Sequence, residues 1–338
     1  MGDIYSIAYA MNIDGKGVKK MNIQKRRLGK TDIAVTPIGL GVMQFSGGKG
    51  LFGRAFPNLS QEEKNSIIQA ALEGGINWFD TAELYGFGYS EQGLSAGLKA
   101  AGVQNGEVLI ETKWFPILRT ARNISKTIHD RIHYLNGYSI DIYLVHQPYG
   151  FSSPEAEMDA MADLVEAGLI RYVGISNFNA DRMRRAHAEL KKRGLPLAVN
   201  QMEYSLLDRR IESNGVLEVA KELDVTIVAY TPLGYGLLTG KYHKNPDLFK
   251  QTPRGFVLKR KFEQSRPVVE ALEKIGEKYN ATPGQVALNW VIYNQGKSVV
   301  TIPGATKAEH ARESAGAMQF KLSDDDLARL DELSKAFK

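Results

Sequence analysis

Residues 171–202 read RYVGISNFNADRMRRAHAELKKRGLPLAVNQM, a stretch that holds one strand–helix–strand pattern. The run Arg171–Ile175 is short and mostly apolar, and the amphipathic segment Asn177–Arg193 follows it. Gly194 marks the end of that helical segment. The next run, Ala198–Met202, is again short and mostly apolar. Short apolar strands that alternate with amphipathic helices predict a parallel sheet with helices packed on its surface.

The same pattern repeats along the chain from about residue 36 to about residue 320. Ser60 with Glu63, and Thr282 with Pro283, are pairs that typically begin helices. Eight strand–helix units favour a closed parallel barrel, although an open doubly wound sheet has the same periodicity. We expect fold class α/β, a (β/α)8 TIM barrel formed by a single domain over residues 21–338, with residues 1–20 as an N-terminal extension. The expected strands are Pro37–Met43, Ile76–Thr81, Glu107–Thr112, Ile140–Val145, Arg171–Ile175, Ala198–Met202, Thr226–Tyr230 and Ser298–Ile302.

Three segments lie outside this repeat. Gln24–Val35 has the pattern of a small hairpin that turns at Gly29–Lys30, and before the first strand it would plug the bottom of the barrel. Gly234–Gln264 is expected to be a long basic loop after the seventh strand, and loops of that length are often functional. Ser323–Phe337 is expected to form a terminal amphipathic helix.

The composition excludes several classes of protein. The chain has 338 residues, no cysteine and a formal net charge of +5. Disulfides, thiolate catalysis and cysteine zinc sites are therefore excluded, and the charge is too diffuse to indicate nucleic-acid binding. No apolar run reaches the roughly 18 residues of a membrane span, and residues 1–20 lack the pattern of a signal peptide. We expect a cytoplasmic protein without a membrane or nucleic-acid partner, and the oligomeric state stays open.

Two apparent nucleotide-binding motifs fail on inspection. Gly39 and Gly41 resemble the start of a dinucleotide fingerprint, but Gln44 stands where the third glycine is needed. Residues 234–241 resemble a phosphate-binding loop, but Tyr242 stands where that loop needs Ser or Thr. The six histidines are scattered and predict no metal site. The sequence therefore predicts neither a Rossmann fold nor a P-loop.

Polar side chains stand at the ends of the second, third and fourth expected strands, where barrel enzymes place their chemistry. Tyr85, in the loop after Asp80, can give a proton to a carbonyl oxygen that becomes negative as its carbon receives a hydride. Lys113 would lower the pKa of this tyrosine, and Asp80 would supply the counter-charge that a buried lysine needs. His146 can donate a second hydrogen bond that orients the carbonyl. Further polar residues at strands five to seven are Ser176, Asn177, Asn200, Gln201 and Tyr230.

Each of the four residues also has an ordinary structural interpretation. Asp80 alone could cap a helix, and Tyr85 alone could belong to the core or the surface. Lys113 alone could be a solvated loop charge, and His146 alone could be a structural histidine. Their joint position at three adjacent strand ends favours a catalytic site.

The sequence resembles the aldo-keto reductases from about Arg26 to Ala336, and in particular a branch that includes pyridoxal- and aldehyde-type reductases and voltage-gated potassium channel β-subunits. The resemblance implies the barrel of that family, an NADP(H) cofactor and a tetrad in which Tyr85 is the proton donor, Asp80 and Lys113 tune it, and His146 orients the substrate. The matching runs are Gly75–Gly86, Glu111–Lys113, Leu144–His146, Gly174–Phe178, Asn200–Gln201 with Tyr204, Ala229–Gly234, Leu238–Lys241 and Ile302–Ala305.

The resemblance also implies where the cofactor lies. The nicotinamide carboxamide would meet Ser176, Asn177 and Gln201, and Tyr230 would stack on the ring. The pyrophosphate path would be lined by Thr231, Pro232, Leu233, Gly234, Gly236, Leu238 and Lys241, and the adenosine end by Arg254, Gly304, Thr306, Lys307, His310, Glu313 and Ser314.

Two positions depart from this branch, which usually has Gln at His310 and Asn at Ser314. We still expect NADP(H), because Lys241, Lys307 and Arg254 offer partners for a 2′-phosphate. We expect Met43, Phe45, Trp114 and Tyr204 to line the substrate pocket. The segment Phe45–Pro57 would fold over the mouth of the barrel. The expected substrates are aldehydes or ketones, aromatic or sugar-like.

Three functions compete. The first is an NADP-dependent reductase acting on small carbonyl compounds. The second is a nicotinamide-binding sensor subunit like those of potassium channels, but there the tetrad histidine is often altered, whereas this chain keeps His146. The third is a barrel isomerase or lyase, which would leave Tyr85 without a role. The sequence therefore favours the reductase.

Overall fold

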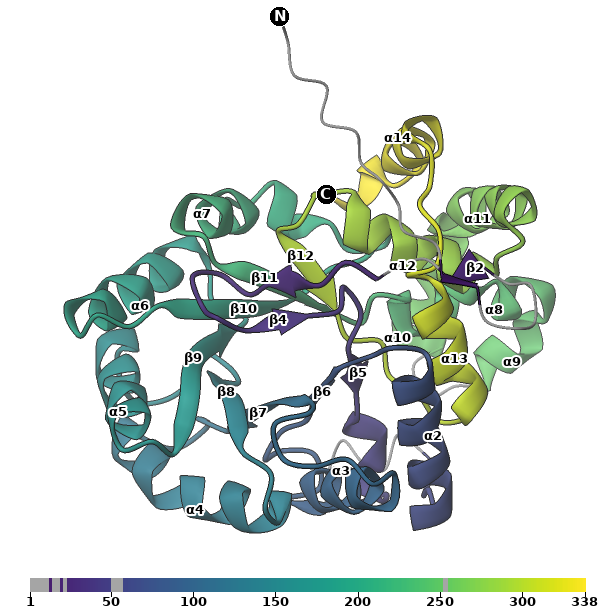
Figure 1. Cartoon of the computed structure of the whole chain (residues 1–338). Coiled ribbons are helices and arrows are strands. Elements are labelled where there is room, and N and C mark those ends of the chain that lie inside the picture. The colour runs from purple at the N-terminus through teal and green to yellow at the C-terminus, as the bar shows by residue number, and fades with distance from the viewer. Residues whose placement is uncertain (1–11, 14–18, 21–22, 50–56, 252–254) are drawn as a thin grey trace, which may run out of the picture.

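The structure is a computed structural model that describes residues 12–13, 19–20, 23–49, 57–251 and 255–338 (Figure 1). The strands are β1 (Asn12–Ile13), β2 (Lys19–Lys20), β3 (Arg26–Arg27), β4 (Ala34–Val35), β5 (Leu40–Gly41), β6 (Trp78–Asp80), β7 (Leu109–Trp114), β8 (Ile140–Val145), β9 (Ile170–Ser176), β10 (Leu197–Glu203), β11 (Thr226–Tyr230) and β12 (Val299–Thr301). The α-helices are α2 (Gln61–Glu73), α3 (Tyr89–Ala100), α4 (Ile124–Leu135), α5 (Pro154–Glu166), α6 (Ala180–Lys192), α7 (Val216–Leu223), α8 (Lys241–Lys244), α9 (Pro246–Lys250), α10 (Gly255–Gln264), α11 (Arg266–Tyr279), α12 (Pro283–Tyr293), α13 (Ala308–Gly316) and α14 (Asp324–Leu333). The 3-10 helices are η1 (Met43–Ser46), η2 (Ala121–Asn123), η3 (Arg210–Glu212), η4 (Gly234–Thr239) and η5 (Lys335–Phe337).

Eight parallel strands follow one another around the sheet in chain order, from β5 to β12. The two end strands also meet: the N–H of Gly39 donates to the Thr301 oxygen at 2.8 Å, and the N–H of Thr301 donates to the Pro37 oxygen at 2.9 Å. Close to this seam, Arg26 donates to the Val299 oxygen at 2.5 Å, across 273 positions of sequence. The sheet is therefore closed, which confirms the predicted barrel and rules out the open doubly wound alternative.

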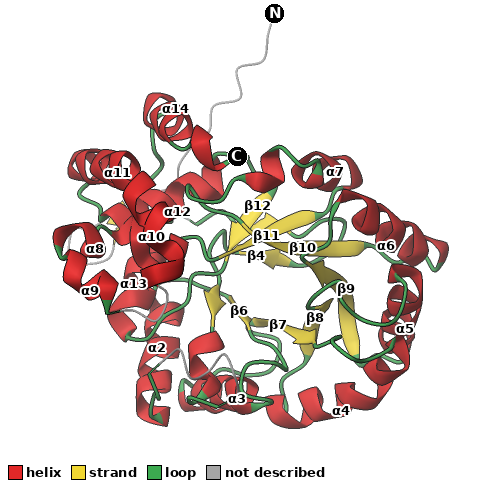
Figure 2. Ribbon diagram, turned by 180° about the vertical axis from the view of Figure 1, so that it is seen from behind, coloured by secondary structure: helices red, strands yellow, loops and turns green. Residues whose placement is uncertain are grey.

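The hairpin of β3 and β4 covers one end of this barrel (Figure 1). Its side chains Leu28, Ile33 and Val35 are buried in a core cluster with residues of β8, β10, β11 and β12. At the tip, Gly29 has φ 49°, and a Cβ there would lie only 2.7 Å from the Asp224 oxygen. Only glycine fits this approach. The predicted plug is confirmed, and Figure 2 shows the barrel from the opposite side.

Helices surround the barrel (Figures 1 and 2), and two of them begin at the expected signals. Ser60 and Glu63 form a capping box before α2, and Thr282 caps α12 with Pro283 in the first turn. The helix after β9 begins later than expected, at Ala180 rather than Asn177, because Asn177 has the left-handed φ of 62°. A residue with positive φ cannot continue a right-handed helix.

The segment after β11 differs from its prediction. Instead of one long loop, the described residues 234–251 and 255–264 contain η4 and the helices α8, α9 and α10. Apolar contacts within the segment explain this order, since Phe249 is buried and its ring stacks on that of Phe262 at 4.5 Å. The terminal helix is also shorter than expected: α14 ends at Leu333, and η5 covers the last residues.

Two strands differ in length from their predictions. The expected strand Pro37–Met43 is reduced to β5, because Met43 enters η1, while β7 extends to Trp114. Two expected parts of the site lie outside the described residues: Arg254 of the adenosine end, and residues 50–56 of the segment expected over the mouth. Among the described residues, no helix is long and apolar enough to cross a membrane. The division into residues 1–20 and residues 21–338 stays a prediction.

Candidate active site

Lys113 and Asp80 form a buried ion pair inside the barrel. Both face the interior from neighbouring strands, β7 and β6, and their side chains are 0% and 3% exposed. Lys113 Nζ donates to Asp80 Oδ1 at 2.5 Å and to the Thr81 oxygen at 2.8 Å. Burial lowers the pKa of Lys113, but the negative charge of Asp80, together with Tyr85 and Glu111, outweighs burial, so the pKa lies above its ordinary value. The lysine is therefore a fixed positive charge at neutral pH.

Tyr85 lies in the loop after β6, with Lys113 Nζ 5.0 Å from the centre of its ring. Burial raises the pKa of Tyr85 to about 12, and the positive charge of Lys113 offsets only part of this rise. The net direction is opposite to the lowering expected from the sequence, because desolvation disfavours the phenolate more than one ammonium favours it. Tyr85 is therefore a protonated phenol over the whole neutral range.

His146 stands directly after β8, beside the tyrosine. The two rings meet edge to face, with centroids 5.7 Å apart. Burial and the charge of Lys113 hold the pKa of His146 well below its usual value, so the imidazole is neutral. Its Nδ1 is buried, and no residue that the structure describes forms a hydrogen bond with it. A neutral imidazole carries one N–H that can be donated to a carbonyl oxygen.

The residues expected to hold the nicotinamide are gathered around Asn177. Asn177 Nδ2 donates to the His146 oxygen at 3.3 Å and to Ser176 Oγ at 3.0 Å, and Tyr230 donates its hydroxyl proton to Asn177 Oδ1 at 2.9 Å. Gln201 faces the interior from β10 and donates to Asp80 Oδ1 at 3.0 Å. Strands β8 to β11 thus contribute one connected set of amides and hydroxyls next to the ion pair.

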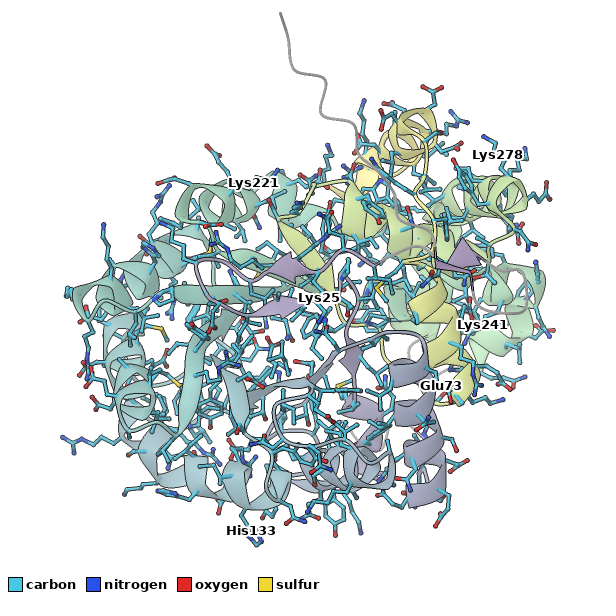
Figure 3. All side chains as sticks on the ribbon, viewed as in Figure 1. Lys25, Glu73, His133, Lys221, Lys241 and Lys278 are labelled. Atoms are coloured by element: carbon cyan, nitrogen blue, oxygen red, sulfur yellow. The ribbon has the colours of Figure 1, made fainter. Side chains whose placement is uncertain are left out.

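The residues expected along the pyrophosphate path run through η4 into α8. Thr231, Gly234 and Gly236 have positive φ, so the backbone turns sharply after β11. Lys241 is exposed at the start of α8 and lies with its Nζ 4.7 Å from the centre of the Tyr242 ring (Figure 3). Pro232 and Leu238 are buried, whereas Leu233 is partly exposed. The backbone of this segment, more than its apolar side chains, is available to a ligand.

The residues of the expected adenosine end meet at the beginning of α13. Lys307 is the N-cap residue of this helix, and His310 Nδ1 lies 3.4 Å from the Thr306 nitrogen and 3.3 Å from its hydroxyl. Lys241 lies close enough for its charge to lower the pKa of His310, after burial, which is the larger cause. Gly304 is exposed before the helix. Helix N-termini with nearby cations are favourable sites for phosphate.

Two other residues of the expected adenosine end are turned to the protein. Ser314 is 5% exposed. Glu313 accepts a 2.5 Å hydrogen bond from the hydroxyl of Thr282, the cap of α12. Their role toward a cofactor stays a prediction.

Among the expected substrate-lining residues, only Met43 is partly exposed. Trp114 is fully buried, and it alternates with Lys113 along β7, so it lies on the helix side of the strand together with Thr112, which donates to Glu91 on α3. Tyr204 is also fully buried and donates to Glu212 at 2.7 Å. The structure therefore does not bring Trp114 and Tyr204 to the mouth beside the tetrad, and Phe45 is likewise buried.

Two carboxyls near the tetrad were missed by the sequence interpretation. Glu83 accepts from the Phe115 nitrogen at 3.0 Å and from Arg119 at 2.7 Å, and so fixes the loop after β7. Glu111 is buried in the interior and accepts from Gln201 at 2.5 Å. Strand alternation could have revealed Glu111, because it stands two residues before Lys113 and must share its face.

Comparisons with known proteins agree with this geometry. The sequence profile of the aldo/keto reductase family matches residues 37–335. Aldo-keto reductase str7 of Strobilurus tenacellus is 35% identical over 93% of this chain and 93% of its own length. The NADP(+) aldo-keto reductase yakc of Schizosaccharomyces pombe is 33% identical over 90% of this chain and 89% of its own. The chloroplastic pyridoxal reductase of Arabidopsis thaliana is 32% identical over 92% and 86%.

Two solved structures share the fold. The thermostable aldo-keto reductase Tm1743, solved with the inhibitor epalrestat, has a TM-score of 0.73 at 29% identity and covers 91% of this chain and 99% of its own. The glycerol dehydrogenase AKR11B4 of Gluconobacter oxydans has a TM-score of 0.77 at 25% identity and covers 94% and 97%. With its closed barrel and its interior lysine–aspartate pair beside a tyrosine and a histidine, the chain belongs to the aldo/keto reductase family.

Proposed function

We propose that this chain reduces aldehydes or ketones to alcohols with NADPH, and that Tyr85 is the proton donor. The observation that carries the proposal is the contact of Tyr85 with a permanently charged Lys113, itself held by Asp80. An ammonium beside a phenol stabilises the phenolate that forms when the proton leaves. The family membership supports the same reaction class.

Each residue of the tetrad has one task in this reaction. NADPH, when bound, supplies a hydride to the carbonyl carbon. Tyr85 gives its hydroxyl proton to the carbonyl oxygen, so that the product is a neutral alcohol, and the phenol later regains a proton from solvent. His146, neutral because burial and the charge of Lys113 lower its pKa, donates an N–H bond that orients the carbonyl oxygen.

The donor set fits a phosphorylated nicotinamide cofactor. Ser176, Asn177 and Gln201 place hydroxyl and amide groups beside the ion pair, and groups of this kind bind a carboxamide. At the other end, Lys241 and Lys307 are exposed, and within the described part of the chain neither forms an ion pair with a carboxylate. Lys307 at the N-terminus of α13, with Lys241 near His310 of the same helix, supports NADP(H) over NAD(H).

The surface around the mouth favours a carbonyl compound with a large apolar body over a sugar. We name as the apolar rim five side chains in the loops after β6, β7 and β8, which are between 40% and 78% exposed: Phe87, Ile117, Leu118, Tyr149 and Phe151. The loops are joined, since the Phe151 nitrogen donates to the Arg119 oxygen at 2.8 Å. Exposed apolar side chains in one group typically mark a binding surface. We propose further that the enzyme works in the cytoplasm.

A substrate panel tests the proposal. Aromatic aldehydes, aliphatic ketones and open-chain sugars are each offered with NADPH or NADH, and the loss of nicotinamide absorbance is followed. We expect turnover with NADPH, higher kcat/KM for the aromatic aldehydes, and weaker use of NADH. The absence of turnover for every carbonyl with either cofactor would contradict the reductase, and equal affinities for NADPH and NADH would contradict the cofactor preference.

A further inference from the structure

A second carboxyl lies beneath the tetrad, and the proposed reaction does not yet use it. Glu111 on β7 is the register partner of Asp80 on β6, so their side chains emerge side by side into the barrel. The residues are 1% and 2% exposed. Two carboxyls that share a buried place beside a single ammonium cannot both stay ionised without a large electrostatic cost.

The hydrogen bonds around these two carboxyls are unequal. Gln201 donates one amide proton to Asp80 Oδ1 at 3.0 Å and the other to Glu111 Oε1 at 2.5 Å. Lys113 donates to Asp80. Among the described residues Glu111 Oε2 is buried without a hydrogen-bond partner, and the carboxyls of Glu111 and Asp80 are close enough to interact. An added proton on Glu111 would satisfy this orphaned oxygen and remove the excess charge.

We propose that Glu111 is a protonated positioning residue, whose carboxyl donates a hydrogen bond to Asp80 and leaves a single negative charge beneath Lys113 and Tyr85. This inference rests on the reductase function proposed above. Burial and the neighbouring charge of Asp80 raise the pKa of Glu111 well above its ordinary value, which agrees with the geometry.

The proton on Glu111 affects how readily Tyr85 donates its own proton. The ionisable groups that face Glu111 are Asp80 from β6, Lys113 on its own strand and Tyr85 from the loop after β6, while Gln201 on β10 is uncharged. An ionised Glu111 would raise the pKa of Tyr85 further, because it adds a negative charge next to the phenol. Proton donation would then be harder, so the protonated form favours reduction, and its loss at high pH slows it.

Two substitutions separate charge from hydrogen bonding. Glu111→Gln keeps the shape and a donor but cannot ionise, so we expect kcat at neutral pH within about threefold of the parent enzyme and an alkaline fall in kcat that moves up by about one pH unit or more. Glu111→Val removes the acceptor of Gln201, and we expect about a tenfold loss of kcat with little change in KM. Circular dichroism checks that the valine variant is folded. If the valine variant is not folded, the pH profile of the glutamine variant alone tests the proposal.

Glu157→Gln is the matched control. Glu157 on α5 is also 1% exposed, and burial raises its pKa to about 7, but it belongs to the outer helix layer. We expect its pH profile to equal that of the parent enzyme. A parent-like alkaline limb in Glu111→Gln would overturn the proposal.

Infrared spectroscopy tests the protonation without relying on activity. At about pH 9, where ordinary carboxyls are ionised, we expect a carbonyl band of a protonated carboxyl in the parent enzyme and in Glu157→Gln, but none in Glu111→Gln. A parent enzyme without that band would also overturn the proposal. Failure of the reductase function is seen separately, as a parent enzyme that oxidises no NADPH with any carbonyl in the substrate panel.

Discussion

The two ends of the expected cofactor site are built in different ways. At the catalytic end (Asp80, Tyr85, Lys113 and His146), the ion pair is buried between two strands, and Tyr85 and His146 lie in the loops after β6 and β8. At the adenosine end (Lys241, Thr306, Lys307 and His310), the cations are exposed and stand on the short helix α8 and at the start of α13. The proposed catalytic groups are therefore preorganised in the barrel, whereas we propose that the lysines of the adenosine end become ordered only when a phosphate binds.

This contrast predicts where substitutions act. Changes at the catalytic end should reduce kcat with little effect on cofactor affinity, since the interactions concern the reacting carbonyl. Changes at the adenosine end should weaken binding and leave the chemical step intact.

The largest effect is expected for Tyr85→Phe, which removes only the hydroxyl group. Without the proton donor, kcat for aldehyde reduction should fall by roughly 10²- to 10⁴-fold. The dissociation constant for NADPH, from a fluorescence titration, should stay within about twofold of the parent value, because the ring remains. Unchanged turnover would sink the proposed mechanism.

Lys113→Met should come next. It removes the charge that favours the phenolate and leaves Asp80 buried without its ammonium, so kcat should fall by about 10²-fold or more, and the melting temperature should fall because a broken buried pair is costly. Adding Asp80→Asn should recover the melting temperature without recovering turnover. Recovery of both would show that the pair serves folding alone.

The adenosine end should respond through affinity. Lys241→Ala and Lys307→Ala should each raise the dissociation constant of NADPH by about tenfold, as expected for the loss of one charge-assisted contact, with no change for NADH and no change in kcat. The effect should shrink in high salt. Lys221→Ala, which removes the same charge from α7 on another side of the molecule, is the control (Figure 3). Equal weakening of NADH binding would contradict the assignment to a 2′-phosphate.

The smallest effect is expected on the rate at which backbone amides exchange hydrogen with solvent. On addition of NADPH, backbone amides of residues 234–251 should exchange with solvent more slowly, whereas those of β6 to β9 should change little, because their hydrogen bonds are already complete. Hydrogen exchange followed by mass spectrometry measures both regions in one sample. Equal slowing in the strands would show that the catalytic end is also assembled by the cofactor.

The sequence predicted the barrel and the plug well because both depend on periodic apolar patterns. It also placed Asp80, Lys113 and His146 together, because parallel strands end at the same side of a barrel. The roles proposed for these residues remain predictions until they are measured.

The sequence did not predict features that depend on a single backbone angle or on which face of a strand a side chain occupies. The left-handed φ of Asn177 delays α6 by one turn, and nothing in the local pattern shows it. Trp114 follows Lys113 in sequence, but alternation along β7 puts it on the opposite face. Burial also reverses the expected pKa direction for Tyr85, because desolvation depends on surroundings that only the fold supplies.

The seam between β5 and β12 has a consequence for biosynthesis. Arg26 and Val299 meet across 273 positions, and at typical translation speeds the later residue leaves the ribosome roughly 14–55 s after the earlier one. During that interval β5 has an unpaired edge. The hairpin of β3 and β4 also lacks the β12 residues of the core cluster against which it packs. The nascent chain therefore exposes apolar strands until its final strand arrives, and chaperones that shield strand edges should bind it most strongly just before β12 emerges.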